Sequence, residues 1–127
     1  MEPRALKCIK CGRSYHPRQA IYTCRSCGSL LDVDYDYSEL DPAQLREEWR
    51  RESPWVWKYH QLLPADPRLK VTLGEGGTGL HRCRRLAEKL GVRELYVKNE
   101  GENPTGSFKD RGMTVGVTVA VMLKAKS

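Results

Sequence analysis

The chain has 127 residues, the length of one ordinary domain, and its 39% hydrophobic and 30% charged residues are typical of a soluble globular protein. No apolar run approaches the roughly 18 residues of a membrane span, and the first residues lack the apolar core of a secretory signal, so we expect no membrane contact and a cytoplasmic location. The net charge of +6 invites a nucleic-acid interpretation, but the surplus is concentrated in residues 81–98, with six Lys/Arg against two Asp/Glu, which favours a solvated or subunit-facing surface.

Four of the five cysteines form two C-x-x-C pairs separated by twelve residues: Cys8, Cys11, Cys24 and Cys27. This spacing predicts a zinc ribbon over residues 1–36, in which each pair turns tightly enough to aim both sulfurs at one ion. Gly12 and Gly28 follow the pairs, where such a turn often needs a positive φ. Four protein ligands leave no open position, so the zinc would be structural. A disulfide framework and a redox pair are less favoured alternatives.

The charge of the ribbon bears on its partner. Residues 1–36 carry six Lys/Arg and four Asp/Glu, and four thiolates with Zn²⁺ add −2, which leaves the ribbon close to neutral. A ribbon that binds nucleic acid usually carries a positive surplus, so we expect this one to dock on its own protein. His16 is not expected to bind the metal, and Cys83 is expected to be a small packed side chain.

Residues 37–71 are predicted to be a helical and irregular connector. Alternating apolar residues over 31–37 indicate a strand before it. A helix is then expected over 42–51, with Pro42 at its first position and Ser38 or Asp41 as its cap. The following stretch, rich in proline and aromatic residues, predicts an irregular segment packed by Trp55, Trp57 and Tyr59.

Residues 72–127 alternate loops, helices and a strand in the manner of an α/β layered domain. The stretch "LGEGGTGL" indicates a glycine-rich turn, either a plain turn or part of a ligand-facing loop. It precedes a helix expected over 82–90, ended by Gly91, and a strand over 95–98. The last element begins at Lys109; its alternating valines resemble a strand, but its length of about sixteen residues favours a helix.

The stretch "NPTGSFKDRG" places Lys109 after small and turn-forming residues, at the expected start of a helix. In open α/β sheets such a position faces the crevice where ligands bind. An amine shielded from water at a helix N-terminus loses part of its preference for the proton, and a neutral amine is a nucleophile. The usual covalent chemistry of lysine is a Schiff base with a carbonyl, so Lys109 is a candidate to hold an aldehyde cofactor.

The motifs "TLGEGGTGL" and "ELYVKNEGENPTGSFKDRG" closely resemble those of the threonine synthase family, which belongs to the fold type II pyridoxal-phosphate enzymes; several prokaryotic members also carry an N-terminal cysteine ribbon. The resemblance implies an α/β fold: a small zinc ribbon followed by the start of a pyridoxal-phosphate dependent domain. It implies that Lys109 binds pyridoxal 5'-phosphate and moves protons in catalysis, that Phe108 and Ser107 shape the cofactor face, and that Asn103 and Thr105 lie near the substrate. Asp110 and Arg111 are expected to pair with the scaffold or to cap the helix.

The implied reaction converts O-phosphohomoserine, an amino-acid phosphate, and water into threonine and phosphate. Family members are several hundred residues long, so the sequence is expected to be an N-terminal portion that is inactive alone, and a full-length parent is expected to be a homodimer. Cysteate synthase and a threonine dehydratase-like lyase remain alternatives on the same scaffold, and a zinc-ribbon binding module is an alternative of another class. The family usually has proline where Gly79 stands, which puts the rigidity of that turn in question.

Overall fold

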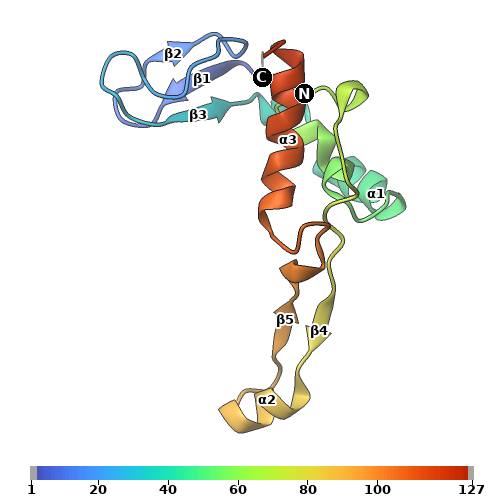
Figure 1. Ribbon diagram of the computed structural model, residues 1–127. Helices are drawn as coiled ribbons and strands as arrows, with labels where there is room; N and C mark the ends of the chain where they lie inside the picture. Colours follow the sequence, from blue (N-terminus) through green and yellow to red (C-terminus); the bar gives the residue numbers. More distant parts are fainter. Residues whose placement is uncertain (1–2, 126–127) are drawn as a thin grey trace.

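The computed structural model describes residues 3–125, and the ends of the predicted segments 1–36 and 72–127 lie outside this range. Figure 1 shows an elongated molecule built around one long helix, α3 (Lys109–Met122), with a small sheet beside one end of it and a narrow arm extending beyond the other. The expected mixed α/β composition is confirmed. Within the described residues, no helix has the length and apolar character needed to cross a membrane.

The small sheet contains β1 (Ala5–Cys8), β2 (Ser14–Tyr15) and β3 (Leu31–Asp34) in the order β2-β1-β3, and both pairings are antiparallel. Leu6 of β1 lies opposite Tyr15 on one side and Val33 on the other. The strand predicted over 31–37 is therefore too long. It ends at Asp34 because the carboxylate of Asp36 accepts hydrogen bonds from the amide and hydroxyl of Ser38 and starts a 3₁₀ turn, η1 (Tyr37–Glu39).

The connector begins with α1 (Pro42–Arg51), where the sequence predicted a helix. Asp41 is its cap, because its carboxylate accepts from the amides of Ala43 and Gln44. The stretch expected to be irregular instead contains the 3₁₀ helices η2 (Val56–Leu62) and η3 (Pro67–Leu69). The aromatic residues there differ in burial: Trp57 is buried, whereas Trp55 and Tyr59 are half-exposed.

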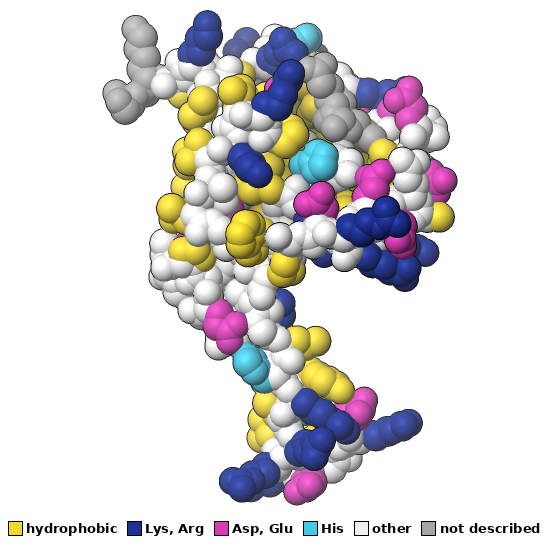
Figure 2. All heavy atoms as spheres, turned by 90° about the vertical axis from the view of Figure 1, so that its right-hand side faces the viewer, with side chains coloured by type: hydrophobic (Ala, Val, Ile, Leu, Met, Phe, Trp, Pro, Cys, Tyr) yellow, Lys and Arg dark blue, Asp and Glu magenta, His cyan; other side chains and the backbone are white. Residues whose placement is uncertain are grey.

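The arm is a two-stranded antiparallel hairpin, β4 (Leu80–Arg82) and β5 (Tyr96–Lys98), with α2 (Arg84–Leu90) between the strands. The helix predicted over 82–90 starts two residues late, because Leu80 to Arg82 pair with β5. Gly91 ends α2 with a φ of 64°, as expected for a C-terminal glycine. Lys and Arg side chains gather at the tip of this arm, around α2, which contains Arg84, Arg85 and Lys89 (Figure 2).

The last element is the helix that its length predicted. Thr114 and Thr118, one turn apart on α3, are 5% and 0% exposed. Their hydroxyls bond to both backbone groups of Val71: that of Thr114 donates to the carbonyl over 2.6 Å, and that of Thr118 accepts from the amide over 2.9 Å. The connector is thus fastened along the helix that begins at Lys109. The valine alternation misleads because the buried face of α3 is lined by threonines, while Val117 and Val121 are partly exposed.

Candidate functional site

The loop before α3 is closed by contacts within itself. The carboxylate of Asp110, a residue only 8% exposed, accepts from the amide of Thr105 over 2.8 Å and from its hydroxyl over 2.5 Å. A negative charge in the first turn also complements the positive end of the helix dipole. These bonds hold residues 105–110 as a compact turn. The direction of the Lys109 side chain is therefore determined by the contacts of this turn.

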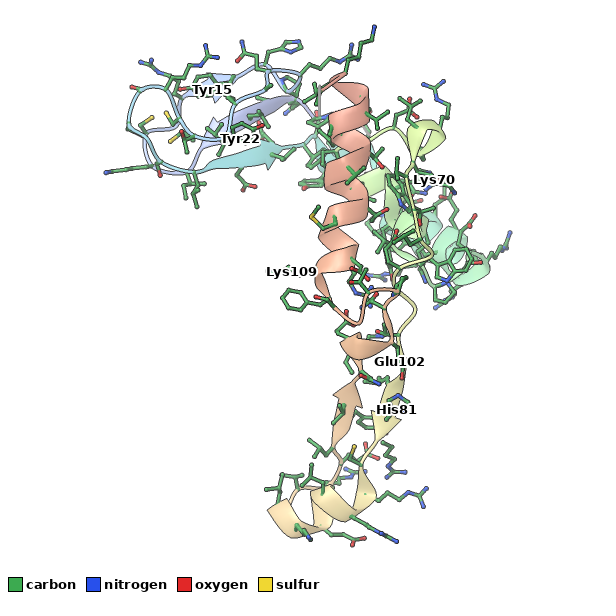
Figure 3. All side chains as sticks on the ribbon, in the orientation of Figure 1. Tyr15, Tyr22, Lys70, His81, Glu102 and Lys109 are labelled. Carbon is green, nitrogen blue, oxygen red and sulfur yellow. The ribbon has the colours of Figure 1, made fainter. Side chains whose placement is uncertain are left out.

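Lys109 is the first residue of α3, and its side chain is exposed. Its amine lies 5.0 Å from the centre of the Phe108 ring, and its amide donates to the hydroxyl of Ser107 over 3.2 Å. In Figure 3 it projects on the side of α3 away from Lys70 and the connector. Within the described residues Lys109 thus points away from the packed threonine face, and the shielded crevice expected around it stays a prediction.

A charged network fastens α3 to the glycine-rich loop. The guanidinium of Arg111 donates to both carboxylate oxygens of Glu100, over 2.7 and 2.9 Å, and to the hydroxyl of Thr78 over 3.0 Å. That hydroxyl donates in turn to Glu100 over 2.7 Å. Hydrogen bonds from Arg111, above all, hold the pKa of Glu100 at about 2. Arg111 thus pairs with the scaffold, one of the two expected roles, and reaches the 3₁₀ turn η4 (Glu100–Glu102).

Asn103 is 4% exposed, and both ends of its side-chain amide are hydrogen-bonded. Its carbonyl oxygen accepts from the amide of Gly76 over 3.0 Å, and its amide nitrogen donates to the backbone and side chain of Glu100 over 2.8 and 3.1 Å. Asn103 therefore joins the lysine loop to the glycine-rich turn. The substrate roles of Asn103 and Thr105 remain predictions.

Sequence reasoning missed two carboxylates that organise this region. Glu100 joins three segments, and Glu75, 2% exposed, accepts from the hydroxyl of Thr72 and the amide of Leu73, both over 2.7 Å. Burial raises the pKa of Glu75 as the largest single effect, but hydrogen bonding from Thr114, Leu73 and Thr72 together outweighs it and leaves that pKa below its ordinary value. The position of Glu75 between glycines was the available signal, because a carboxylate inside a tight turn can accept from nearby backbone amides.

Gly79, which stands where the family usually has proline, has a local explanation. Its amide donates to the carboxylate of Glu102 over 2.6 Å, a bond that proline could not make. The ring of His81, which pairs with Glu102 over 2.9 Å, covers Gly79 so closely that a Cβ there would lie 2.4 Å from its Nε2 atom. Figure 3 shows His81 and Glu102 facing each other beside the start of the arm. The turn is thus held by two hydrogen bonds to Glu102, from the amide of Gly79 and with the ring of His81, instead of by a proline ring.

The four cysteines of the two pairs come together, with all four sulfurs within 4.8 Å of one another. The sulfurs of Cys8 and Cys27 are 3.5 Å apart, and those of Cys11 and Cys24 are 3.6 Å apart. Tetrahedral zinc with Zn–S bonds of about 2.3 Å would separate its sulfurs by roughly 3.8 Å, so the set fits such an ion. All four are free thiols, contrary to the disulfide alternative.

Backbone geometry and hydrogen bonds prepare these thiols as ligands. Gly12 and Gly28 adopt φ values of 74° and 70°, as predicted for the residues after each pair. A hydrogen bond from the hydroxyl of Tyr15 lowers the pKa of Cys24 to about 6. The amide of Cys11 lowers the pKa of Cys8 in the same way. Cys24 and Cys8 thus favour the thiolate form that metal binding requires. The backbone amide of Ser29 lowers the pKa of Cys27, but its bonds to the neighbouring thiols and its burial together raise that pKa to about 12.

Comparison with known proteins identifies the sequence family. Residues 71–126 match the family model described as "Pyridoxal-phosphate dependent enzyme". Threonine synthase from Methanosarcina acetivorans is 58% identical over 118 residues, which cover 93% of this chain and 28% of that protein. Threonine synthase from Methanocaldococcus jannaschii is 55% identical over 115 residues, 90% of this chain and 28% of the relative. A cysteate synthase from Methanosarcina mazei is 32% identical over 112 residues, 83% of this chain and 24% of the relative.

The extent of these matches matters as much as their identity. The chain spans 28% of the length of each of the two threonine synthases. The lysine loop, α3 and the arm fall within the segment that matches the family model. The resemblance read from the motifs is confirmed: residues 71–126 match the pyridoxal-phosphate dependent enzyme family, in a chain similar to threonine synthases over most of its length.

Proposed function

We propose that this chain is part of a pyridoxal-phosphate dependent enzyme that makes threonine and phosphate from O-phosphohomoserine and water, and that Lys109 is the lysine that holds the cofactor. The observation that carries the proposal is the position of Lys109. It leads a fourteen-residue helix, directly after a turn closed by Asp110 and Thr105. Among the described contacts, its amine meets only the ring of Phe108, so no ion pair within residues 3–125 competes for it.

Each residue has a stated role in this proposal. Bound pyridoxal phosphate supplies an electron sink for the substrate. Lys109 would hold the cofactor through its amine and, once the amine of the substrate had displaced it, the freed amine would carry protons between carbon atoms of the substrate. Phe108, 60% exposed, and Ser107 present a face to the cofactor, and Thr105 with Asn103 lies toward the substrate. Asp110 and Arg111 position Lys109 through their bonds to Thr105 and Glu100.

Threonine synthesis is favoured over cysteate synthesis by similarity. The threonine synthases are 58% and 55% identical to this chain, and the cysteate synthase is 32% identical. We expect negligible activity from the 127 residues alone, because they correspond to 28% of a threonine synthase. The proposed activity therefore belongs to a longer polypeptide.

A chimera tests the proposed role of Lys109. The matching segment of the Methanosarcina acetivorans threonine synthase is replaced by this chain, and threonine formation is measured. Lys109→Ala should reduce the rate by at least about 100-fold, the lower end for general acid–base catalysis. Borohydride reduction followed by peptide mapping should place the cofactor on Lys109. Lys70→Ala is the matched control, because Lys70 is also exposed but lies on the other side of α3. Retention of covalent cofactor in Lys109→Ala would refute the proposal.

We also propose that the four cysteines hold one structural zinc ion. The support is the sulfur geometry, with all four donor atoms within 4.8 Å of one another. Four thiolates fill the tetrahedral shell of a zinc ion and leave no coordination position open, as in structural zinc sites. Elemental analysis of the purified chain should find about one zinc per chain. Replacing Cys24 and Cys27 together by serine should abolish it, whereas replacing Cys83, which lies outside the cluster, should leave it unchanged.

A further inference from the structure

Tyr15 makes a directed contact with the cysteine cluster. Its hydroxyl lies 3.1 Å from the sulfur of Cys24 and 2.9 Å from the amide nitrogen of Arg25. A backbone amide can only donate, so the hydroxyl oxygen accepts from Arg25 and its own hydrogen is free to point at the sulfur. Figure 3 places Tyr15 over the cysteine sulfurs, whereas Tyr22 belongs to the same segment without a described bond to them.

This contact also crosses between the two halves of the ribbon. Tyr15 belongs to β2, which pairs with Leu6 and Lys7 of β1, the strand that ends at Cys8. Cys24 and Arg25 belong to the second C-x-x-C pair, which begins sixteen residues after Cys8, the first cysteine of the first pair. The Tyr15 hydroxyl therefore ties the strand hairpin that carries the first pair to the backbone and sulfur of the second pair.

The bond from Tyr15 to Cys24 would reduce the negative charge of a metal-loaded cluster. Four thiolates around one divalent cation leave a net charge of −2, and hydrogen bonds to sulfur draw part of this charge away. Cys8 receives such bonds from the amides of Lys10 and Cys11, both over 3.4 Å. The phenol of Tyr15 is a stronger donor to Cys24 at a shorter distance, and it cannot move away while Arg25 holds its oxygen.

We propose that Tyr15 is a positioning residue of the metal site, which orients the sulfur of Cys24 and stabilises its metal-bound thiolate form. The inference rests on the proposed four-cysteine zinc site. Donors that act on ligands from outside the coordination shell typically contribute about 10- to 100-fold in metal affinity. Tyr15 acts on the metal through Cys24 alone.

The test compares Tyr15→Phe with Tyr22→Phe and wild type in the full 127-residue chain. Tyr22 is the matched control, because it is a tyrosine of the same ribbon and is 90% exposed. Zinc affinity is measured by competition with a chelator of known affinity. We expect Tyr15→Phe to bind zinc about 10-fold more weakly and Tyr22→Phe to match wild type within about 2-fold.

A second measurement separates hydrogen bonding from packing, since phenylalanine keeps the ring. With Co²⁺ in place of zinc, thiolate-to-metal charge-transfer absorption reports the energy of the sulfur lone pairs. Loss of a donor raises that energy, so the band of Tyr15→Phe should move to longer wavelength and that of Tyr22→Phe should not. Equal affinities and equal bands in all three proteins would overturn the role of Tyr15 and leave the metal site standing. Failure of wild type to bind either metal would overturn both.

Discussion

The hydroxyl of Thr114, on α3, bridges the buried indole of Trp57 and the backbone of Val71. It donates to the carbonyl of Val71 over 2.6 Å and accepts from the indole nitrogen of Trp57 over 2.8 Å. Thr114 and Trp57 are 5% and 7% exposed, so water does not replace these bonds readily. The substitution Thr114→Val keeps the shape of the side chain and exchanges the hydroxyl for a methyl group, which leaves both partners unsatisfied.

The magnitude follows from the burial of each orphaned group. A buried donor or acceptor left without a partner costs about 1–3 kcal/mol. The indole of Trp57 should incur most of this, whereas Val71 is 43% exposed and its carbonyl can be partly rehydrated. We therefore expect Thr114→Val to lower the free energy of unfolding by about 2–3 kcal/mol. Thr114→Ser keeps the hydroxyl and loses one methyl group, a change worth about 0.8 kcal/mol.

Urea unfolding followed by tryptophan fluorescence measures the effect, since Trp57 lies at the perturbed site. With a typical slope of about 2 kcal/mol per molar urea, Thr114→Val should lower the midpoint by roughly 1 M and leave the slope unchanged. Thr114→Ser should shift it less than half as far. If Thr114→Val proved as stable as Thr114→Ser, the hydroxyl bridge would not be what holds the connector to α3.

Three further predictions concern the network, the turn and the ribbon. The pKa of Glu100 is lowered to about 2 from an ordinary 4.5, chiefly by Arg111, so its stabilisation is present above about pH 4.5 and is lost as the pH falls toward 2. Unfolding free energy should fall over that window, and Glu100→Gln should flatten the decline; identical slopes would contradict the argument. Gly79→Pro should destabilise the chain by about 1–2 kcal/mol, because the bond from its amide to Glu102 is lost, and an unchanged melting temperature would argue against this. Removal of metal by a chelator should abolish the dispersed NMR amide signals of the ribbon and leave those of α3, and a ribbon unaffected by chelation would not depend on metal.

Several local features were predictable because their causes lie close together in the sequence. The spacing of the cysteines was enough to predict the cluster, since each C-x-x-C turn needs only a glycine with positive φ after it. The cap at Asp41 and the end of α2 at Gly91 depend on neighbouring residues in the same way. The family resemblance was carried by one contiguous motif around Lys109.

The errors arose where distant segments compete for the same residues. The start of α2 was misplaced because Leu80 to Arg82 pair with β5. The apolar periodicity of the helix gives no information about this pairing with a later strand. The stretch of the connector after α1 was expected to be irregular, yet Trp57 is buried against Thr114, 57 residues away, and this contact favours an ordered 3₁₀ helix.

The sequence by itself thus determined the chemical inventory: four thiols at ligand spacing, and a lysine at the start of a helix inside a specific motif. Only the tertiary structure decided the partners, such as Arg111 with Glu100, Asn103 with Gly76 and Tyr15 with Cys24. The physical reason is range. Turns and caps are formed by residues a few positions apart, whereas a hydrogen bond between remote side chains depends on how whole elements pack, which no local pattern encodes.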